Sequence, residues 1–226
     1  MGELSTHPPI AIIGGTGDLG SALAKRWADA GYPVVLGSRA KDKAVAAAAA
    51  MREGGAANVS GDDNVAAAAA AEIVVIAVPF ASHAAILAEI KPAVAGKIVV
   101  DAVVPLVPPK VSVVQLPPEG SAARIAQQIL GPEVRVVSAF HNVGAAKLAA
   151  GGPVDCDVLV FGDDKAARDA VIALADSAGT RGVDGGALAN SAAAEAFTSV
   201  LIGINRRYKV DGAGIRITGL PPAGTR

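Results

Sequence analysis

Short apolar runs alternate with longer amphipathic or alanine-rich stretches along most of the chain. The run over 73–78 is apolar throughout and rich in β-branched residues, which is typical of a strand buried on both faces. We predict strands over 10–13, 34–36, 58–60, 73–78, 97–101, 135–139, 157–161 and 180–183, and helices over 19–30, 41–52, 62–71, 82–90, 121–130, 164–177 and 190–207. This alternation predicts an α/β fold with a doubly wound parallel sheet and right-handed crossovers.

A glycine-rich turn follows the first predicted strand at once. Its sequence is Gly15-Thr16-Gly17-Asp18-Leu19-Gly20, a G-x-G-x-x-G pattern that opens a predicted helix. The glycines allow a tight turn, a close approach of the backbone to a pyrophosphate, and close packing of helix on strand. The helix N-terminus adds free N–H groups and the positive end of its dipole. A glycine-rich turn alone is common in α/β proteins, but this context favours a Rossmann-type dinucleotide site.

The end of the second predicted strand indicates which dinucleotide is bound. An NAD site usually places Asp or Glu about 20 residues after the glycines, where it binds the ribose 2′-hydroxyl. Here that place holds Ser38 and Arg39, and Lys41 and Lys43 follow. A hydroxyl and fixed cations suit a 2′-phosphate, so we predict NADP(H). The alternative is that these cations simply form the solvated start of a helix.

The amino-acid composition limits the binding partners and the cellular compartment that we expect for this protein. Hydrophobic residues are 52% of the 226 residues, which is ample for a large core, and aromatic residues are only 3%, so small aliphatic side chains must fill it. The net charge of −1 and the lack of a basic stripe argue against nucleic acid. The single Cys156 excludes an intrachain disulfide and fits a reducing cytoplasm. We expect no signal peptide and no membrane partner.

The order of predicted elements suggests two unequal parts. We predict a dinucleotide-binding domain over 9–140 and a smaller C-terminal αβ lobe with the last long helix over 141–217. Residues 1–8 are expected to be a disordered leader, and 218–226 a tail. Ligands of such folds bind outside the carboxyl ends of the strands. The loops expected to meet there are those at Pro79, at 101–105 and at 140–144.

Few side chains in this predicted cleft could act as an acid or a base. His141 is the one histidine on a predicted cleft loop, and ligand contact and packing stay equally open for it. We expect His83 on a helix surface, Asp101 as a loop cap, and Asp163 and Asp164 as a turn and a helix cap rather than metal ligands. Reduction of a ketone needs a proton donor near the developing alkoxide. Hydride exchange between two cofactors depends less on such a donor. We therefore predict no metal and name no catalytic residue.

A series of short segments between residues 10 and 217 matches one family. The chain resembles the NADPH:coenzyme F420 oxidoreductases (F420-dependent NADP reductases), which pass hydride between NADP(H) and an 8-hydroxy-5-deazaflavin. The glycine-rich turn and Leu36-Gly37-Ser38-Arg39 are shared with many dinucleotide-binding proteins. The segments more specific to the family are Val78-Pro79-Phe80, Val103-Val104-Pro105, Ser138-Ala139-Phe140-His141, Gly162-Asp163-Asp164, Leu188-Ala189-Asn190-Ser191 and Gly214-Ile215-Arg216.

The resemblance assigns roles to individual residues. It implies that Thr16 to Leu19 hold the pyrophosphate and that His141 lies near the deazaflavin. It implies direct hydride transfer by a homodimer, with coenzyme F420 as the second substrate. The remaining contacts it implies are Ser38, Arg39 and Lys43 on the 2′-phosphate, and Val78, Pro79, Val104 and Ala145 around the nicotinamide.

The chain also departs from the family pattern. Phe80 stands where the archaeal pattern has Trp, and Asp101-Ala102 replaces Ser-Pro. The proline-rich segment 105–118 and the tail 218–226 lie outside the pattern. These departures concern the acceptor side. They leave two alternatives: an NADPH-dependent reductase of a flavin, a pterin or a small carbonyl or imine, and a non-catalytic NADP(H)-sensing protein.

Overall fold

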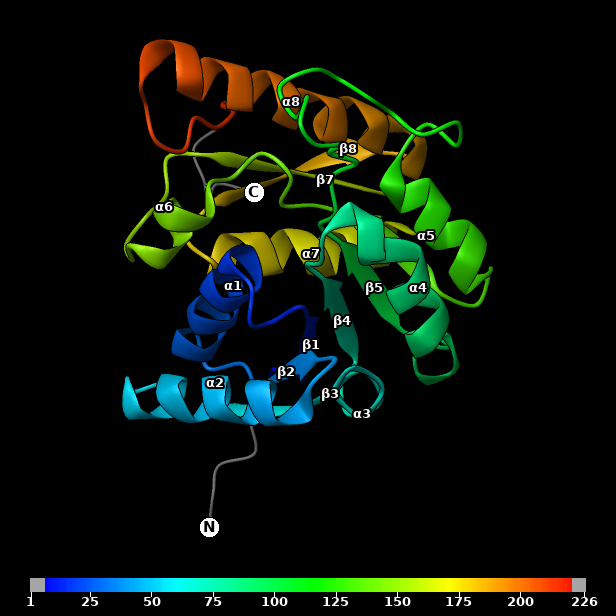
Figure 1. Cartoon of the computed structure of the whole chain (residues 1–226), viewed down its shortest axis with the longest axis vertical. Helices are drawn as coiled ribbons and strands as arrows, with labels where there is room; N and C mark the ends of the chain where they lie inside the picture. Colours follow the sequence, from blue (N-terminus) through cyan, green and yellow to red (C-terminus); the bar gives the residue numbers. More distant parts are fainter. Residues whose placement is uncertain (1–6, 221–226) are drawn as a thin grey trace.

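The structure, a computed structural model of the chain, describes residues 7–220 (Figure 1). Its strands are β1 (Ile10–Ile13), β2 (Val34–Ser38), β3 (Val59–Asp63), β4 (Ile73–Ile76), β5 (Ile98–Asp101), β6 (Arg135–Ser138), β7 (Asp157–Gly162) and β8 (Arg181–Gly186). Its α-helices are α1 (Asp18–Asp29), α2 (Lys41–Glu53), α3 (Asn64–Ala69), α4 (Phe80–Ile90), α5 (Ala122–Leu130), α6 (Ala145–Ala149), α7 (Lys165–Ser177) and α8 (Ser191–Tyr208). Two 3₁₀ turns are η1 (Lys91–Ala93) and η2 (Leu188–Asn190). The predicted elements are all present, with ends shifted by a few residues, whereas α6 was not predicted because five residues show no periodicity.

One eight-stranded sheet runs through the molecule in the order β3-β2-β1-β4-β5-β6-β7-β8. The predicted α/β, Rossmann-type fold is confirmed, and the sheet is parallel except at one junction, where β7 runs antiparallel to β6. The paired residues, Val137 with Gly162 and Ser138 with Phe161, lie at the carboxyl ends of both strands. The connection between them therefore stays on the carboxyl side of the sheet instead of crossing back.

Helices cover both faces of the sheet. Alternate residues of β1 enter different cores: Ile10 and Ile12 pack with α1, α2 and α7, and Ala11 and Ile13 pack with α3, α4 and α5. This follows from the two-residue period of a strand, whose successive side chains point to opposite faces. Figure 1 shows the resulting three layers, with α1 and α2 on one side of β1–β5 and α4 and α5 on the other. Small side chains let these helices lie close to the sheet.

Two side chains of α1 fasten the second half of the chain to the first. Trp27 is fully buried, donates from Nε1 to the Leu174 carbonyl at 2.9 Å, and packs edge-on against Phe140. Arg26 donates from Nε to the Leu148 carbonyl at 2.7 Å and from its guanidinium to the Gly152 carbonyl at 2.5 Å. The short α6 is thereby held against α1, beside the carboxyl edge of the sheet.

The parts predicted as a separate lobe share this sheet. The strands β7 and β8 continue it, so the domain boundary at residue 140 stays a prediction. The C-terminal segment returns to β7, where the Ile217 N–H donates to Asp157 Oδ2 at 2.6 Å. Residues 1–6 of the predicted leader and 221–226 of the predicted tail lie outside the described residues. The described part of the leader includes His7, whose ring stacks on Tyr32. Between residues 7 and 220, no helix is both long and apolar enough to cross a membrane.

Candidate functional site

A cavity of about 390 Å³ lies at the carboxyl ends of β1, β2 and β4. The chain turns from β1 toward β2 on one side of this point, and β4 flanks β1 on the other side. Such a topological switch point is where ligands of open α/β sheets bind. The lining residues are Gly14, Thr16, Gly17, Ser38, Arg39, Ala40, Lys43, Asn64, Ala77, Val78, Pro79, Ser82 and Ile86.

The glycine-rich turn forms the floor of this cavity. Gly14 has a φ of +87°, and a Cβ there would clash with the carbonyl of Ala77, the residue after β4. A Cβ on Gly20 would clash with the Gly14 carbonyl, so Gly20 brings α1 close to the turn as predicted. Gly15 also leaves no room for a side chain, because a Cβ there would lie 2.9 Å from the Ile12 carbonyl oxygen. Gly17 caps α1 without a side-chain hydrogen bond, which leaves the helix N-terminus open toward the cavity.

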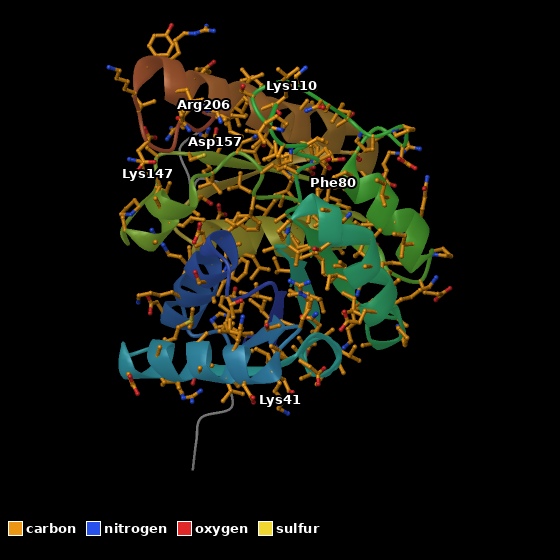
Figure 2. All side chains as sticks on the ribbon, viewed as in Figure 1. Lys41, Phe80, Lys110, Lys147, Asp157 and Arg206 are labelled. Atoms are coloured by element: carbon orange, nitrogen blue, oxygen red, sulfur yellow. The ribbon has the colours of Figure 1, made fainter. Side chains whose placement is uncertain are left out.

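Two of the three predicted cations face this cavity. Arg39 and Lys43 line it beside Ser38, at the start of α2. Lys41 lies outside, because its Nζ pairs with Asp62 Oδ1 at 2.7 Å. This hydrogen bond raises the pKa of Lys41 and lowers that of Asp62. Figure 2 shows Lys41 on α2, far from Phe80 at the start of α4.

The opposite wall is mostly apolar and comes from the link between β4 and α4 and from α4 itself. Val78 and Pro79 form it as the resemblance implied, and Ser82 and Ile86 extend it along α4. Asn64, which sequence reasoning missed, closes the side nearest β3; it is buried and donates to Glu89 at 3.5 Å. Its position directly after β3, at the same carboxyl edge, is the signal that could have identified it.

The remaining predicted contacts do not line this cavity. Gly15 is buried within the turn, and Asp18 and Leu19 lie on the first turn of α1. Val104 follows β5 and Ala145 begins α6, so both lie on a second group of carboxyl-end loops together with His141. The structure thus separates a phosphate-side cavity from a neighbouring group of loops after β5 and β6.

A buried polar cluster underlies this second group of loops. Asp101, the last residue of β5, accepts a hydrogen bond from His83 Nε2 at 2.8 Å on one oxygen and from the Val103 N–H at 3.0 Å on the other. The prediction of His83 on a helix surface is therefore wrong: the residue is 1% exposed, and helical periodicity alone could not show its partner. Asp101 does cap the following loop, as expected.

His141 is also buried, and it follows a residue with an unusual backbone conformation. The preceding Phe140 has a φ of 67°, which is uncommon for a residue other than glycine, and its ring is held by Trp27. His141 Nε2 lies 3.3 Å from Ser138 Oγ. Burial lowers the pKa of His141 to about 4, so the imidazole is neutral at pH 7.

Glu195 on α8 completes the cluster, although no sequence signal singled it out. Its carboxyl accepts from the N–H groups of Ala122 at 2.6 Å and Ala123 at 3.2 Å, the first turn of α5. Burial raises the pKa of Glu195 to about 8, and nearby Asp101 adds to this effect. Asp163 and Asp164 take structural roles, since Asp163 accepts from the Leu188 N–H and Asp164 caps α7.

No group of three or more His, Cys, Asp or Glu side chains suited to a metal ion occurs among the described residues. The cavity itself presents two cations, a helix N-terminus and an apolar wall. Such a set binds the phosphates of a dinucleotide at one end and a flat, uncharged ring at the other.

Comparison with known proteins agrees with this chemistry. The family model described as "NADP oxidoreductase coenzyme F420-dependent" matches residues 9–105. The chain is 42% identical to an F420-dependent NADP reductase of Methanocaldococcus jannaschii over 221 residues, covering 93% of this chain and 98% of that protein. It is 40% identical to the F420-dependent NADP reductase of Methanothermobacter marburgensis, covering 94% and 99%. A crystal structure of a putative F420-dependent NADP reductase from Arthrobacter sp. FB24 has a TM-score of 0.77 and 28% identity, covering 93% and 99%.

Proposed function

The chain belongs to the F420-dependent NADP reductase family, and from this premise we propose that it transfers a hydride directly between NADP(H) and the deazaflavin coenzyme F420. The observation that carries the proposal is the joint placement of the glycine-rich turn, Arg39 and Lys43 around one cavity. In the direction of deazaflavin reduction, NADPH and a proton are consumed, the hydride moves from the nicotinamide to the deazaflavin ring, and NADP⁺ is released.

The phosphate side of the cavity holds the NADP(H) in this proposal. The open N-terminus of α1, with Thr16 and Gly17, binds the pyrophosphate through backbone N–H groups. Arg39 and Lys43 bind the 2′-phosphate through charge-assisted hydrogen bonds, and the Ser38 hydroxyl adds a further contact. Asp62 pairs with Lys41, and Asp63 accepts from the Ala66 N–H, so both carboxylates at the end of β3 have partners of their own.

The apolar wall holds the nicotinamide ring. Val78 and Pro79 contact one side of it, and Val104 and Ala145 approach from the loops after β5 and β6. The neutral His141 lies on the same side and contacts the deazaflavin. These residues act by holding two rings at the distance that hydride transfer needs, and by excluding water between them.

A homodimer is the second part of the proposal. Phe197 and Val200 leave apolar surface on α8, and the proline-rich segment beside it exposes Val113, Val114 and Leu116. A Cβ built on Gly203 of α8 would lie 3.9 Å from Ser112 Cβ, so this segment passes close to α8. We expect a second copy to cover this face, which sedimentation equilibrium checks. The single, buried Cys156 also supports our expectation that the protein works in the cytoplasm.

An absorbance assay with parallel acceptors tests the function. NADPH is mixed with oxidised coenzyme F420 and, separately, with FMN and with FAD. The proposal predicts rapid loss of the visible deazaflavin band and no reduction of the flavins. Reduction of a flavin instead would favour the alternative of another acceptor. Tight NADPH binding without reduction of any acceptor would favour a sensing protein.

A further inference from the structure

The residues proposed to flank the nicotinamide lie on two segments that follow different strands. Pro79 follows β4 and precedes α4, and Val104 follows β5. The pair His83–Asp101 joins these same two segments, since His83 lies in the first turns of α4 and Asp101 ends β5. We propose that this pair is a positioning device that fixes the two segments relative to each other and so orients the nicotinamide for hydride transfer. The inference rests on the proposed function.

The geometry of Asp101 explains how one side chain fixes two segments. One carboxyl oxygen accepts from His83 Nε2 at 2.8 Å, and the other accepts from the Val103 N–H at 3.0 Å. The first bond holds α4 and the second holds the backbone one residue before Val104. Both side chains are almost wholly buried, at 1% and 0% exposure, where water does not compete for these bonds.

The backbone hydrogen bonds at the end of β5 connect it to neighbouring strands rather than to α4. The Ala102 N–H donates to the Ile76 carbonyl at 3.0 Å, and the Ala139 N–H donates to the Asp101 carbonyl at 3.1 Å. These bonds tie the end of β5 to its neighbouring strands. Beyond Val103 the segment forms a tight local turn, in which the Leu106 N–H donates to the Val104 carbonyl at 2.7 Å. The Asp101 carboxyl adds a direct hydrogen bond between the end of this strand and α4.

A buried polar pair of this kind fixes the relative position of the segments it joins more than it adds to the stability of the fold. Replacing such pairs with well-packed apolar residues is often neutral for stability, because burial of charge offsets the attraction between the partners. Hydrogen bonds, however, demand particular distances and angles, whereas apolar contacts tolerate sliding. The pair therefore specifies the separation of Pro79 from Val104. A displacement of about 1 Å between reacting groups slows a reaction by roughly 100-fold.

The test compares three variants of the pair with a matched control on the same helix. His83→Ala removes the bond, His83→Gln retains an amide N–H donor, and Asp101→Asn weakens both ends. Leu87→Ala is the control, because Leu87 is fully buried one turn further along α4 and makes no contact assigned to the site. It reproduces the loss of packing on α4 without touching Asp101.

Three readouts separate positioning from a general loss of structure. Single-turnover absorbance gives the rate of hydride transfer to coenzyme F420. The fluorescence of bound NADPH reports how firmly its nicotinamide ring is held. The dissociation constant of 2′,5′-ADP, which lacks the nicotinamide, reports the phosphate side alone. We expect His83→Ala to slow hydride transfer by roughly 10- to 100-fold and to lower the fluorescence of bound NADPH, with 2′,5′-ADP affinity unchanged. His83→Gln recovers much of the rate, and Leu87→Ala keeps it.

Several results would overturn the inference. They are a wild-type transfer rate in His83→Ala, an equal slowing in Leu87→Ala, and a parallel loss of 2′,5′-ADP affinity. If the wild-type protein bound NADPH but did not reduce coenzyme F420, the proposed function would fail instead. The fluorescence of bound NADPH in wild type and His83→Ala would then still decide the positioning role.

Discussion

The two sides of the candidate site are built on different physical principles. The phosphate side consists of exposed cations, Arg39 and Lys43, and an open helix N-terminus. The side beneath the loops after β5 and β6 consists of buried groups with fixed partners: His83, Asp101 and Glu195. The phosphate side attracts negative charge, and salt weakens that attraction. The buried side fixes geometry, and salt screens its interactions much less. Binding strength and orientation can therefore be altered separately in this protein.

The largest effect is expected from Glu195→Ala, on the buried side. The change leaves the N–H groups of Ala122 and Ala123 buried without an acceptor, at a cost of roughly 1–3 kcal/mol for each. Urea denaturation measures the resulting fall in the free energy of unfolding, and 2′,5′-ADP affinity should not change. Glu195→Gln, which keeps one acceptor oxygen, should lose less. Equal stability of Glu195→Ala and wild type would contradict the capping role.

The next largest effect is expected from Arg39→Ala, on the exposed side. Loss of a charge-assisted contact to the 2′-phosphate should weaken NADP(H) binding by roughly 1–3 kcal/mol and NAD(H) binding far less. Fluorescence titration with both cofactors, at low and high salt, measures this difference. The salt dependence of NADP(H) binding should also become shallower. An equal loss for the two cofactors would remove the assignment of Arg39 to the 2′-phosphate.

The pH dependence of stability sharpens the comparison. His141 has a pKa near 4 in the folded protein and about 6.5 when unfolded. Its contribution to stability is complete above pH 6.5 and is lost as the pH falls toward 4, because the unfolded chain binds the extra proton. The urea concentration at the midpoint of unfolding should fall less steeply with decreasing pH in His141→Gln than in wild type. Identical slopes would show that His141 is not held neutral by burial.

Glu195 should act in the opposite direction. Its pKa is near 8 in the folded protein and about 4.5 when unfolded, so the folded protein holds the extra proton. Stability from this group is present below pH 4.5 and declines as the pH rises toward 8. Above about pH 7.5, where His141 is almost wholly neutral in both the folded and the unfolded state, Glu195→Gln should flatten this decline. A flat wild-type profile in that range would contradict the raised pKa.

The smallest effect is expected from Lys41→Ala, the matched control for Arg39. Lys41 has the same charge and lies on the same helix, but it pairs with Asp62 outside the cavity. Its removal should leave the ratio of NADP(H) to NAD(H) affinity close to that of wild type in the same titration. A loss as large as that of Arg39→Ala would mean that Lys41 leaves Asp62 to bind the phosphate.

The contrast between the two sides also explains what could be predicted from the sequence. The glycine-rich turn and the Ser38-Arg39 segment lie within one strand–helix–strand unit, so their spacing alone predicted a nucleotide cleft. The pair His83–Asp101 joins residues 18 positions apart on a helix and a strand, and Glu195 meets α5 across 73 positions. Such partners depend on how the sheet places its strand ends. The antiparallel β7 was missed for the same reason, since a single strand carries no sign of its direction.

Transfer of an isotope label tests the central claim most directly. NADPH carrying deuterium at the transferring position of the nicotinamide is mixed with oxidised coenzyme F420 and the protein in ordinary water, and the reduced deazaflavin is weighed by mass spectrometry. Direct hydride transfer predicts one deuterium retained in each molecule of reduced product. Reduced deazaflavin without deuterium, or no reduction at all, would contradict direct transfer between the two cofactors.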